Sequence, residues 1–172
     1  ERAVVCIGSH DLLIDVVADR MRARDPLSSI VSGHVGSLGG LLALAQGQAH
    51  LAGCHLIDPK SGEYTLPFVR EHLAEMAVRV VRLAGRVQGI YVRPGNPKSI
   101  RSFADLARPD VTFVNRQKGA GTRMLLDLRL LEAGIDPASV RGYEREQPTH
   151  MAVAAAVASG LCDAALGIEA AA

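Results

Sequence analysis

Apolar and polar residues follow one another along the chain in blocks of two kinds. Short apolar runs rich in β-branched residues predict strands, and longer stretches with apolar positions three and four apart predict helices. The strands we expect are residues 3–7, 28–31, 49–57, 111–114 and 163–168, with a brief one at 142–144. The expected helices are residues 12–24, 37–46, 65–77, 100–106, 122–133 and 151–159.

The sequence also predicts the inner faces and the caps of several helices. The apolar face of helix 12–24 contains Leu13, Val17 and Met21, and that of helix 122–133 contains Met124, Leu125, Leu128 and Leu131. Ser9 or Asp11 is the expected cap of the first helix, Ser37 of the second and Thr149 of the last.

One stretch interrupts this alternation. Residues 78–92 hold two β-rich runs, VRVVRL and VQGIYV, separated only by Ala84, Gly85 and Arg86. A single strand of that length is unusual, so we expect two strands or one bent crossing segment. The order of elements is typical of an α/β protein with two lobes, in which mainly parallel sheets are flanked by helices. We expect residues 1–88 plus 164–172 to form the first lobe and residues 89–163 the second.

The stretch Val111–Ala133 is the most informative local pattern. A short apolar run leads into a turn containing Gly119 and Gly121, and then into a long Leu-rich helix for which Thr122 is the expected N-cap. Free amides and the positive end of the helix dipole make this geometry an anion cradle. The third glycine of a dinucleotide fingerprint is absent, and no P-loop lysine follows. A plain strand-to-helix turn with solvated cations remains the alternative. Of the two arginines in this stretch, we expect Arg116 to reach a ligand and Arg123 to pair with Asp127, four residues later in the helix.

Polar side chains also follow the other predicted strands. The carboxyl ends of parallel strands are where open α/β sheets bind ligands. We therefore take as candidate ligand-binding residues Ser9, His10, Ser37, His55, Asn115, Arg116, Gly121, Thr122, Arg123, Thr149 and His150. Any single hydroxyl in this set can be an ordinary helix cap. Taken together, hydroxyls, amides and guanidinium groups suit a compact oxyanion or a small carboxylate.

The composition argues against several classes of function, including nucleic-acid binding. The net charge is +1, so no general attraction to nucleic acid is implied, and 3% aromatic residues without tryptophan argue against a base-stacking surface. Three dispersed cysteines, Cys6, Cys54 and Cys162, indicate reduced buried thiols and a cytoplasmic protein. The sequence contains no apolar span of 18 residues, the length that would indicate a membrane-spanning helix. The abrupt ends of the chain suggest a piece of a longer protein.

The sequence motifs give little support for a catalytic or a metal-binding function. Among the cysteines and histidines, Cys54 and His55 are the one adjacent pair, and no CxxC, HxxxH or HxH spacing occurs. Ser9, His10 and Asp11 are the residue types of a catalytic triad. The side chains of neighbouring residues diverge, however, so these three cannot align as nucleophile, base and orienting group. We therefore expect a non-catalytic binding domain with no catalytic residue, no metal site and no cofactor.

Several quoted motifs resemble a known family. They are GIYVRPGNPKSI at 89–100, FADL at 103–106 and FVNRQKGAGTRMLLD at 113–127, with GSHD at 8–11, GSLGG at 36–40 and Thr149-His150 in support. Together they look like the periplasmic-binding-protein-like domain of molybdate-related proteins. In that family the domain is fused to MoeA-type molybdopterin-biosynthesis proteins or to winged-helix regulators of the ModE or LysR kind.

The resemblance implies a type II periplasmic-binding-protein-like fold with a ligand in an interlobe cleft. It implies molybdate or tungstate as the ligand, in molybdenum-cofactor biosynthesis or molybdate-responsive regulation. The alternative is an effector-sensing domain of a LysR- or ModE-like transcription regulator for another small anionic metabolite. Expected partners are a small anion, a fused winged-helix or MoeA-like domain and a second copy of the chain, without direct contact to nucleic acid or membrane. By this resemblance the main ligand contacts are Ser9, Ser37, Arg116, Thr122 and Arg123.

Overall fold

The computed structural model describes residues 2–172, which divide into two compact units. Of the described residues, unit 1 comprises those up to Arg79 together with Gly119–Gly121, and unit 2 comprises Val80–Lys118 and Thr122–Ala172. Both units combine strands and helices, as the α/β prediction requires. Each unit is described by itself below.

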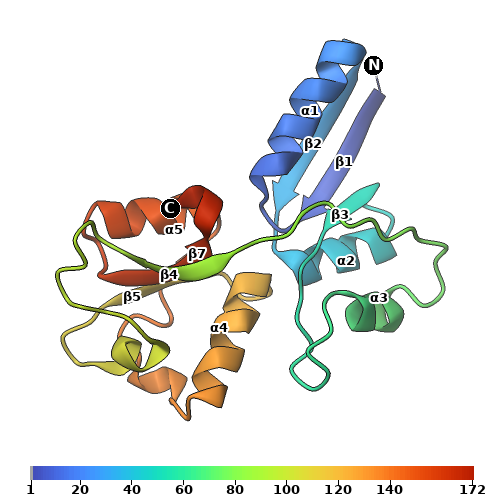
Figure 1. Cartoon of the computed structure of the whole chain (residues 1–172). Coiled ribbons are helices and arrows are strands. Elements are labelled where there is room, and N and C mark those ends of the chain that lie inside the picture. The colour runs from blue at the N-terminus through green and yellow to red at the C-terminus, as the bar shows by residue number, and fades with distance from the viewer. Residues whose placement is uncertain (1) are drawn as a thin grey trace. The chain divides into compact units, whose positions relative to one another are not determined.

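Unit 1 is built on a three-stranded parallel sheet in the order β2-β1-β3 (Figure 1). Its strands are β1 (Arg2–Gly8), β2 (Ser28–His34) and β3 (Leu51–Gly53). Its helices are α1 (Leu12–Arg24), α2 (Ser37–Ala45) and α3 (Leu66–His72). Because all three strands run in one direction, the loops after β1, β2 and β3 share one edge of the sheet.

Helix α1 begins at the cap that the sequence indicates but covers less than expected. The carboxylate of Asp11 accepts a hydrogen bond from the Leu13 amide at 2.8 Å, which confirms Asp11 as one of the two predicted caps. No residue of α1 is buried, and Val17, expected on the inner face, is 41% exposed. Sequence spacing identifies an apolar face, but it does not tell how much of that face is covered.

Unit 2 contains a mixed four-stranded sheet in the order β4-β7-β5-β6. Its strands are β4 (Gln88–Val92), β5 (Phe113–Arg116), β6 (Glu146–Gln147) and β7 (Ala164–Ile168). Strand β4 is antiparallel to β7, and the other pairs are parallel. The helices are α4 (Gly121–Glu132), of which Gly121 belongs to unit 1, and α5 (His150–Ala158). Short 3-10 turns lie at Phe103–Ala107, Pro137–Ser139 and Glu169–Ala171.

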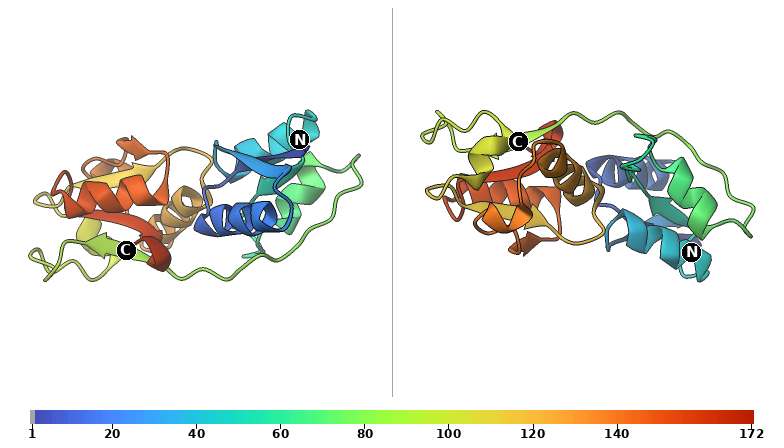
Figure 2. Two further views of the ribbon diagram at one scale, coloured as in Figure 1. Left: turned by 90° about the horizontal axis from the view of Figure 1, so that it is seen from above. Right: turned by 90° about the horizontal axis from the view of Figure 1, so that it is seen from below.

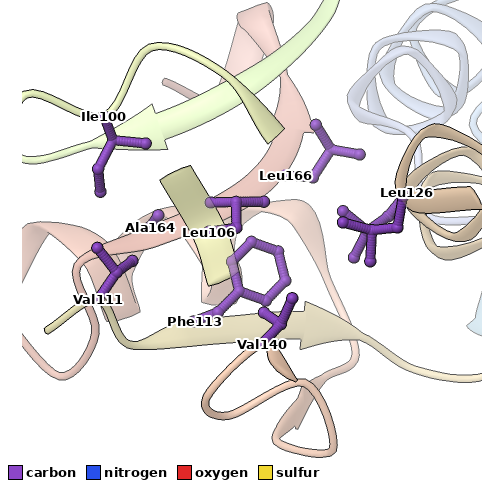
Figure 3. Packing of buried hydrophobic residues seen from close by; sticks show 9 residues of the cluster. Ile100, Leu106, Val111, Phe113, Leu126, Val140, Ala164 and Leu166 are labelled. Carbon is purple, nitrogen blue, oxygen red and sulfur yellow. The ribbon is translucent and has the colours of Figure 1, made fainter. Parts of the chain in front are cut away.

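The larger core cluster of unit 2 lies around the ring of Phe113 (Figure 3). Leu106 from the first 3-10 turn, Val140, Leu126 of α4 and Leu166 of β7 are in this cluster. Helix α5 covers β7 and β5, as the views in Figure 2 also show. Leu126 and Leu130 are the fully buried leucines of α4, whereas Leu131, expected on the apolar face, is 73% exposed. The buried stripe of α4 is therefore shifted from the predicted one.

Several predicted elements are shorter than expected or lie elsewhere. The strand expected at 49–57 is confined to Leu51–Gly53, and the helix expected at 65–77 ends at His72. The first β-rich run, residues 78–83, forms no strand, while the second gives β4. The brief strand expected at 142–144 lies instead at Glu146–Gln147. A β-rich run becomes a strand only where a neighbour offers hydrogen-bonding partners, which local sequence does not reveal.

The end of the chain lies in unit 2, whereas we expected residues 164–172 to return to the first lobe. Strand β7 pairs with β4 from Gln88–Ile168 to Val92–Ala164 and with β5 at Phe113–Ala164. The Tyr91 hydroxyl also donates to the Ile168 carbonyl. Strand β7 is buried along its whole length, so its pairing is fixed by the core of unit 2.

Two further expectations concern environment. No helix within residues 2–172 is long and apolar enough to cross a membrane. The three cysteines are free thiols, as predicted, with Cys6 and Cys162 buried and Cys54 half-buried. Burial raises the pKa of all three thiols, and that of Cys162 reaches about 11.

Candidate functional site

Arg116 is a charged residue that is almost fully buried in unit 2. It is the last residue of β5, and its side chain is 1% exposed. Its Nη2 donates to the Pro148 carbonyl at 3.0 Å and its Nε to the Gln117 amide oxygen at 3.1 Å. Its Nη1 is buried and has no hydrogen-bond partner among residues 2–172. Two of the three guanidinium nitrogens thus have hydrogen-bond partners, and Nη1 has none among the described residues.

The charge of Arg116 has no counter-ion within the described chain. No ion pair joins Arg116 to an acidic side chain of residues 2–172, and Glu146, on the strand beside it, pairs with Arg123 instead. Burial lowers the pKa of Arg116 to about 10, so the group is still charged near neutral pH. Tyr91 lies close enough to counter part of this shift, but burial raises the pKa of Tyr91 and keeps the phenol neutral. A buried and uncompensated charge is costly, which marks this position as a candidate anion site.

Arg123 lies in the first turns of α4 and has a different environment. Its Nε is 3.4 Å from Asp127 Oδ1, and its Nη1 is 3.4 Å from Glu146 Oε1. Its guanidinium carbon is also 4.0 Å from the centroid of the Tyr143 ring. The predicted pairing with Asp127 is confirmed. Arg123 is therefore charge-compensated, and its contacts are those of a structural residue.

Thr122 does not cap α4, contrary to the prediction. The helix begins at Gly121, so Thr122 lies inside it, and its hydroxyl donates to Gln88 Oε1 at 2.8 Å. Asn115 also makes internal contacts, with Nδ2 donating to the Tyr143 carbonyl and Oδ1 accepting from the Arg116 amide. Both side chains are buried and fix the ends of β4 and β5. Gln88 and Tyr91, both of β4, are neighbours that the sequence did not single out.

Thr149 and His150 begin α5, as expected. The Thr149 hydroxyl accepts from the Ala152 amide at 3.1 Å, which confirms the predicted cap. His150 is 1% exposed. The carbonyl of Pro148, just before this cap, is the one that holds Arg116. The start of α5 therefore lies next to the guanidinium.

In unit 1, Ser37 and His55 are brought together. Ser37 is the first residue of α2 and not its cap, because Gly36 occupies the cap position. The Ser37 hydroxyl accepts from the His55 amide at 3.2 Å and lies 3.4 Å from His55 Nδ1. Ser37 is 0% exposed. The predicted hydroxyl is thus present at the sheet edge, with a histidine rather than its own helix as its partner.

Ser9 and His10 follow β1 on the same edge. The Ser9 hydroxyl is buried and has no hydrogen-bond partner among residues 2–172. The His10 ring meets the His34 ring edge-on, with centroids 4.8 Å apart. His34 is the last residue of β2. The loops after all three strands of unit 1 therefore bring polar side chains to one edge.

The turn Gly119–Gly121 packs within unit 1. The Leu38 amide donates to the Gly119 carbonyl at 3.3 Å. A Cβ on Gly121 would lie 2.3 Å from the His55 carbonyl oxygen, and a Cβ on Gly36 would lie 2.9 Å from the Gly119 carbonyl oxygen. Gly121 of the predicted cradle and Gly36 before α2 thus permit close backbone contacts near Ser37 and His55.

Two hollows on unit 2 lie away from these residues. One is lined by residues between Pro137 and Arg145, and the other includes Val114, Gln147 and Cys162. Neither includes any of the predicted ligand-binding residues. We therefore take the strand-end residues of each unit, considered separately, as the candidate binding residues.

Comparison with known proteins gives a family and relatives. Residues 18–172 match the model of a family described as the PBP superfamily domain. An uncharacterized protein of Bacillus subtilis, YvgK, is 35% identical over 171 residues, which is 98% of this chain and 54% of that protein. The chain therefore spans about half the length of this relative.

Solved structures match at lower identity. A Clostridium perfringens protein, assigned to a phosphate ABC transporter and carrying bound phosphate, has a TM-score of 0.66 at 17% identity, covering 98% of this chain and 71% of that one. The sulfate-binding protein SubI of Mycobacterium tuberculosis has 0.59 at 13%, covering 98% and 65%. Arginine-bound ArgBP of T. maritima has 0.57 at 13%, covering 98% and 74%. At these identities the comparison shows a shared fold only. The three proteins with this fold differ in their ligands.

Proposed function

The chain belongs to the PBP superfamily domain family, and on that premise we propose that it is a non-catalytic binding domain for a small oxyanion. The observation that carries the proposal is Arg116, whose buried guanidinium has no acidic partner among residues 2–172. Removing a charge from water costs several kcal/mol unless it is paired. A bound anion would supply the missing charge.

A buried charged donor in unit 2 supports an oxyanion ligand. Arg116 Nη1 is buried with hydrogen-bonding capacity to spare. Hydrogen bonds between a guanidinium and an oxyanion are about twice as strong as neutral ones. Among solved proteins of this fold, bound phosphate and sulfate binding provide precedents. Molybdate and tungstate have the same shape and charge as sulfate, and the quoted motifs favour them.

The biological setting is proposed separately. The free thiols of Cys6, Cys54 and Cys162 support a reducing compartment, and we propose the cytoplasm. A role in molybdenum-cofactor synthesis or in an anion-responsive regulator rests on the motif resemblance alone. The second candidate ligand class is a small carboxylate, because Arg116 would pair equally with a carboxylate, and ArgBP binds an amino acid in this fold.

Isothermal titration calorimetry tests the proposal. The chain would be titrated with phosphate, sulfate, molybdate and tungstate, with acetate and arginine as members of the competing classes. We expect at least one tetrahedral oxyanion to bind with a Kd below about 1 mM and to bind more tightly than acetate or arginine. Tighter binding of arginine or acetate would favour the carboxylate class. Failure of all six to bind would refute the proposed function.

A further inference from the structure

Helix α1 of unit 1 is covered on one side only. None of its residues is buried, and α1 packs chiefly against β2. Ile14, Ala18 and Met21, four and three residues apart, are half-buried and mark the side of α1 that faces the sheet. Figure 1 shows α1 lying alongside β1 and β2. The opposite side of α1 is therefore a surface of unit 1 that the described residues leave uncovered.

This uncovered side carries a stripe of mainly apolar residues. The stripe consists of Leu12, Val16, Asp19 and Ala23, at successive spacings of four, three and four residues. Val16 is 51% exposed, and Asp19 and Ala23 are exposed as well. Apolar positions that alternate between spacings of three and four form the line along which one helix packs against another. The stripe therefore has the form of a helix-pairing surface.

Two opposite charges flank the stripe on the same side. Asp15 lies in the first turn of α1 and Arg22 in its last turn. They are seven residues apart, close to two full turns, so they lie on the same side of the helix. Both are exposed, and neither forms an ion pair with another of residues 2–172. A second α1 that runs antiparallel beside the first would place each Asp15 next to the partner's Arg22.

We propose that α1 is the contact helix of a dimer of this chain, in which two copies pair antiparallel along the stripe and each Asp15 binds the partner's Arg22. Twofold symmetry repeats every contact, so the ion pair forms twice. The inference does not depend on the proposed function. It concerns a different element of unit 1 and a different kind of partner.

The charges of α1 fit a second copy because they are divided between its two halves. Asp15 and Asp19 lie in the first half, and Arg20, Arg22 and Arg24 lie in the second. Antiparallel pairing brings the acidic half of each helix to the basic half of the other, and it also opposes the two helix dipoles. Parallel pairing would gather the arginines of both copies at one end.

Asp19 keeps this dimer weak. It is the charged member of the stripe and lies near the middle of α1, so the two copies of its carboxylate approach each other across the twofold axis. A contact made by one helix of 13 residues is also smaller than a standard interface. We therefore expect a monomer–dimer equilibrium with a Kd of about 10–100 μM.

Sedimentation equilibrium of the whole chain tests the inference. Asp15→Arg and Arg22→Asp should each raise the dimer Kd at least about tenfold, because each creates two like-charge contacts. Asp19→Ala should lower the Kd by removing the repulsion at the twofold axis. Arg20→Asp is the matched control, since it makes the same charge change on the same helix without losing a proposed ion pair, and it should keep the Kd within about threefold. Circular dichroism confirms that each variant is folded.

Mixing variants tests the pairing itself. In an equal mixture of Asp15→Arg and Arg22→Asp chains, each introduced charge faces an opposite charge on the partner, so dimers of wild-type affinity should return. A mixture of Asp15→Arg with Arg20→Asp should not restore them. Wild type that stays monomeric up to about 500 μM overturns the inference. So does a dimer that neither charge reversal weakens, or a first mixture that fails to associate. None of these results bears on anion binding, which the calorimetry above tests separately.

Discussion

The guanidinium of Arg123 lies over the ring of Tyr143, with its central carbon 4.0 Å from the ring centroid. The same guanidinium is within 3.4 Å of carboxylate oxygens of Asp127 and Glu146. Arg116, seven residues earlier, has neither an aromatic ring beneath it nor a carboxylate beside it among the described residues. Two buried arginines of one loop and helix thus differ in what balances their charge. We therefore predict a role in stability for Arg123 and, under the proposed function, a role in anion binding for Arg116.

The first prediction concerns Arg123. Replacing it by methionine should lower the free energy of unfolding by about 2–3 kcal/mol, because the cation–π contact is lost and Asp127 and Glu146 lose their buried partner. Urea unfolding followed by circular dichroism measures the change. The control is Arg129→Met, whose ion pair with Glu132 lies at the surface. Its effect should stay below about 1 kcal/mol. Equal effects of the two substitutions would contradict the structural role of Arg123.

The second prediction concerns Gly36. Its φ is +85°, and a Cβ there would lie 2.9 Å from the Gly119 carbonyl oxygen. Gly36→Ala should therefore destabilise the protein by about 2–4 kcal/mol, through backbone strain and collision together. Gly47→Ala is the matched control, because Gly47 has a φ of +68° with no atom within 4 Å of the added carbon. It should cost about 1 kcal/mol. If both variants lose the same stability in thermal unfolding, the close contact with Gly119 is not important.

The third prediction concerns Asp163, the residue just before β7. Its carboxylate accepts from the amide and hydroxyl of Thr112 at 2.9 and 2.7 Å and from Lys98 at 3.1 Å. Burial acts to raise the pKa of Asp163, but the hydrogen bonds from Thr112 and Lys98 outweigh it and hold this pKa below the ordinary value. Asp163→Asn should lower the free energy of unfolding at pH 7 by about 2–4 kcal/mol.

The pH dependence of this contribution has a definite sign. Because the pKa of Asp163 is depressed in the folded state, its stabilisation is present above the unfolded pKa near the ordinary value of 3.8. It is lost as pH falls through the folded pKa. The difference in stability between wild type and Asp163→Asn should therefore be constant from pH 7 to about 5 and shrink at more acidic pH. A difference that is independent of pH down to the acid transition would show that the carboxylate is not the stabilising form.

Much of the fold could be predicted because the signals are local. The apolar runs at β1, β5 and β7 are short and sharply bounded, and Asp11 and Thr149 cap their helices through side chains that the sequence displays. Long-range partners have no such signal. The run at 78–83 has strand composition but no neighbouring strand, and β7 is placed by pairing with β4 and β5.

The contacts of the candidate site also divide into local ones, which the sequence predicts, and long-range ones, which it does not. The sequence indicated that Arg116 and Arg123 differ and that Arg123 pairs with Asp127, because residues four apart on a helix are neighbours. It could not indicate that Glu146 also pairs with Arg123, since that contact depends on the register of β6 beside β5. Ser37 and Thr122 were expected as caps. Instead they bond to His55 and Gln88, residues 18 and 34 positions away in sequence.

The most direct test of oxyanion binding is a calorimetric comparison of wild type with Arg116→Met, using the tetrahedral anion that binds wild type most tightly. Methionine fills similar space without charge. Removal of an uncompensated buried charge should therefore leave the free energy of unfolding within about 1 kcal/mol of wild type. The account predicts that anion affinity nevertheless falls at least about 100-fold, as expected for a lost charged hydrogen-bonding partner. Unchanged affinity in a folded Arg116→Met protein would contradict it.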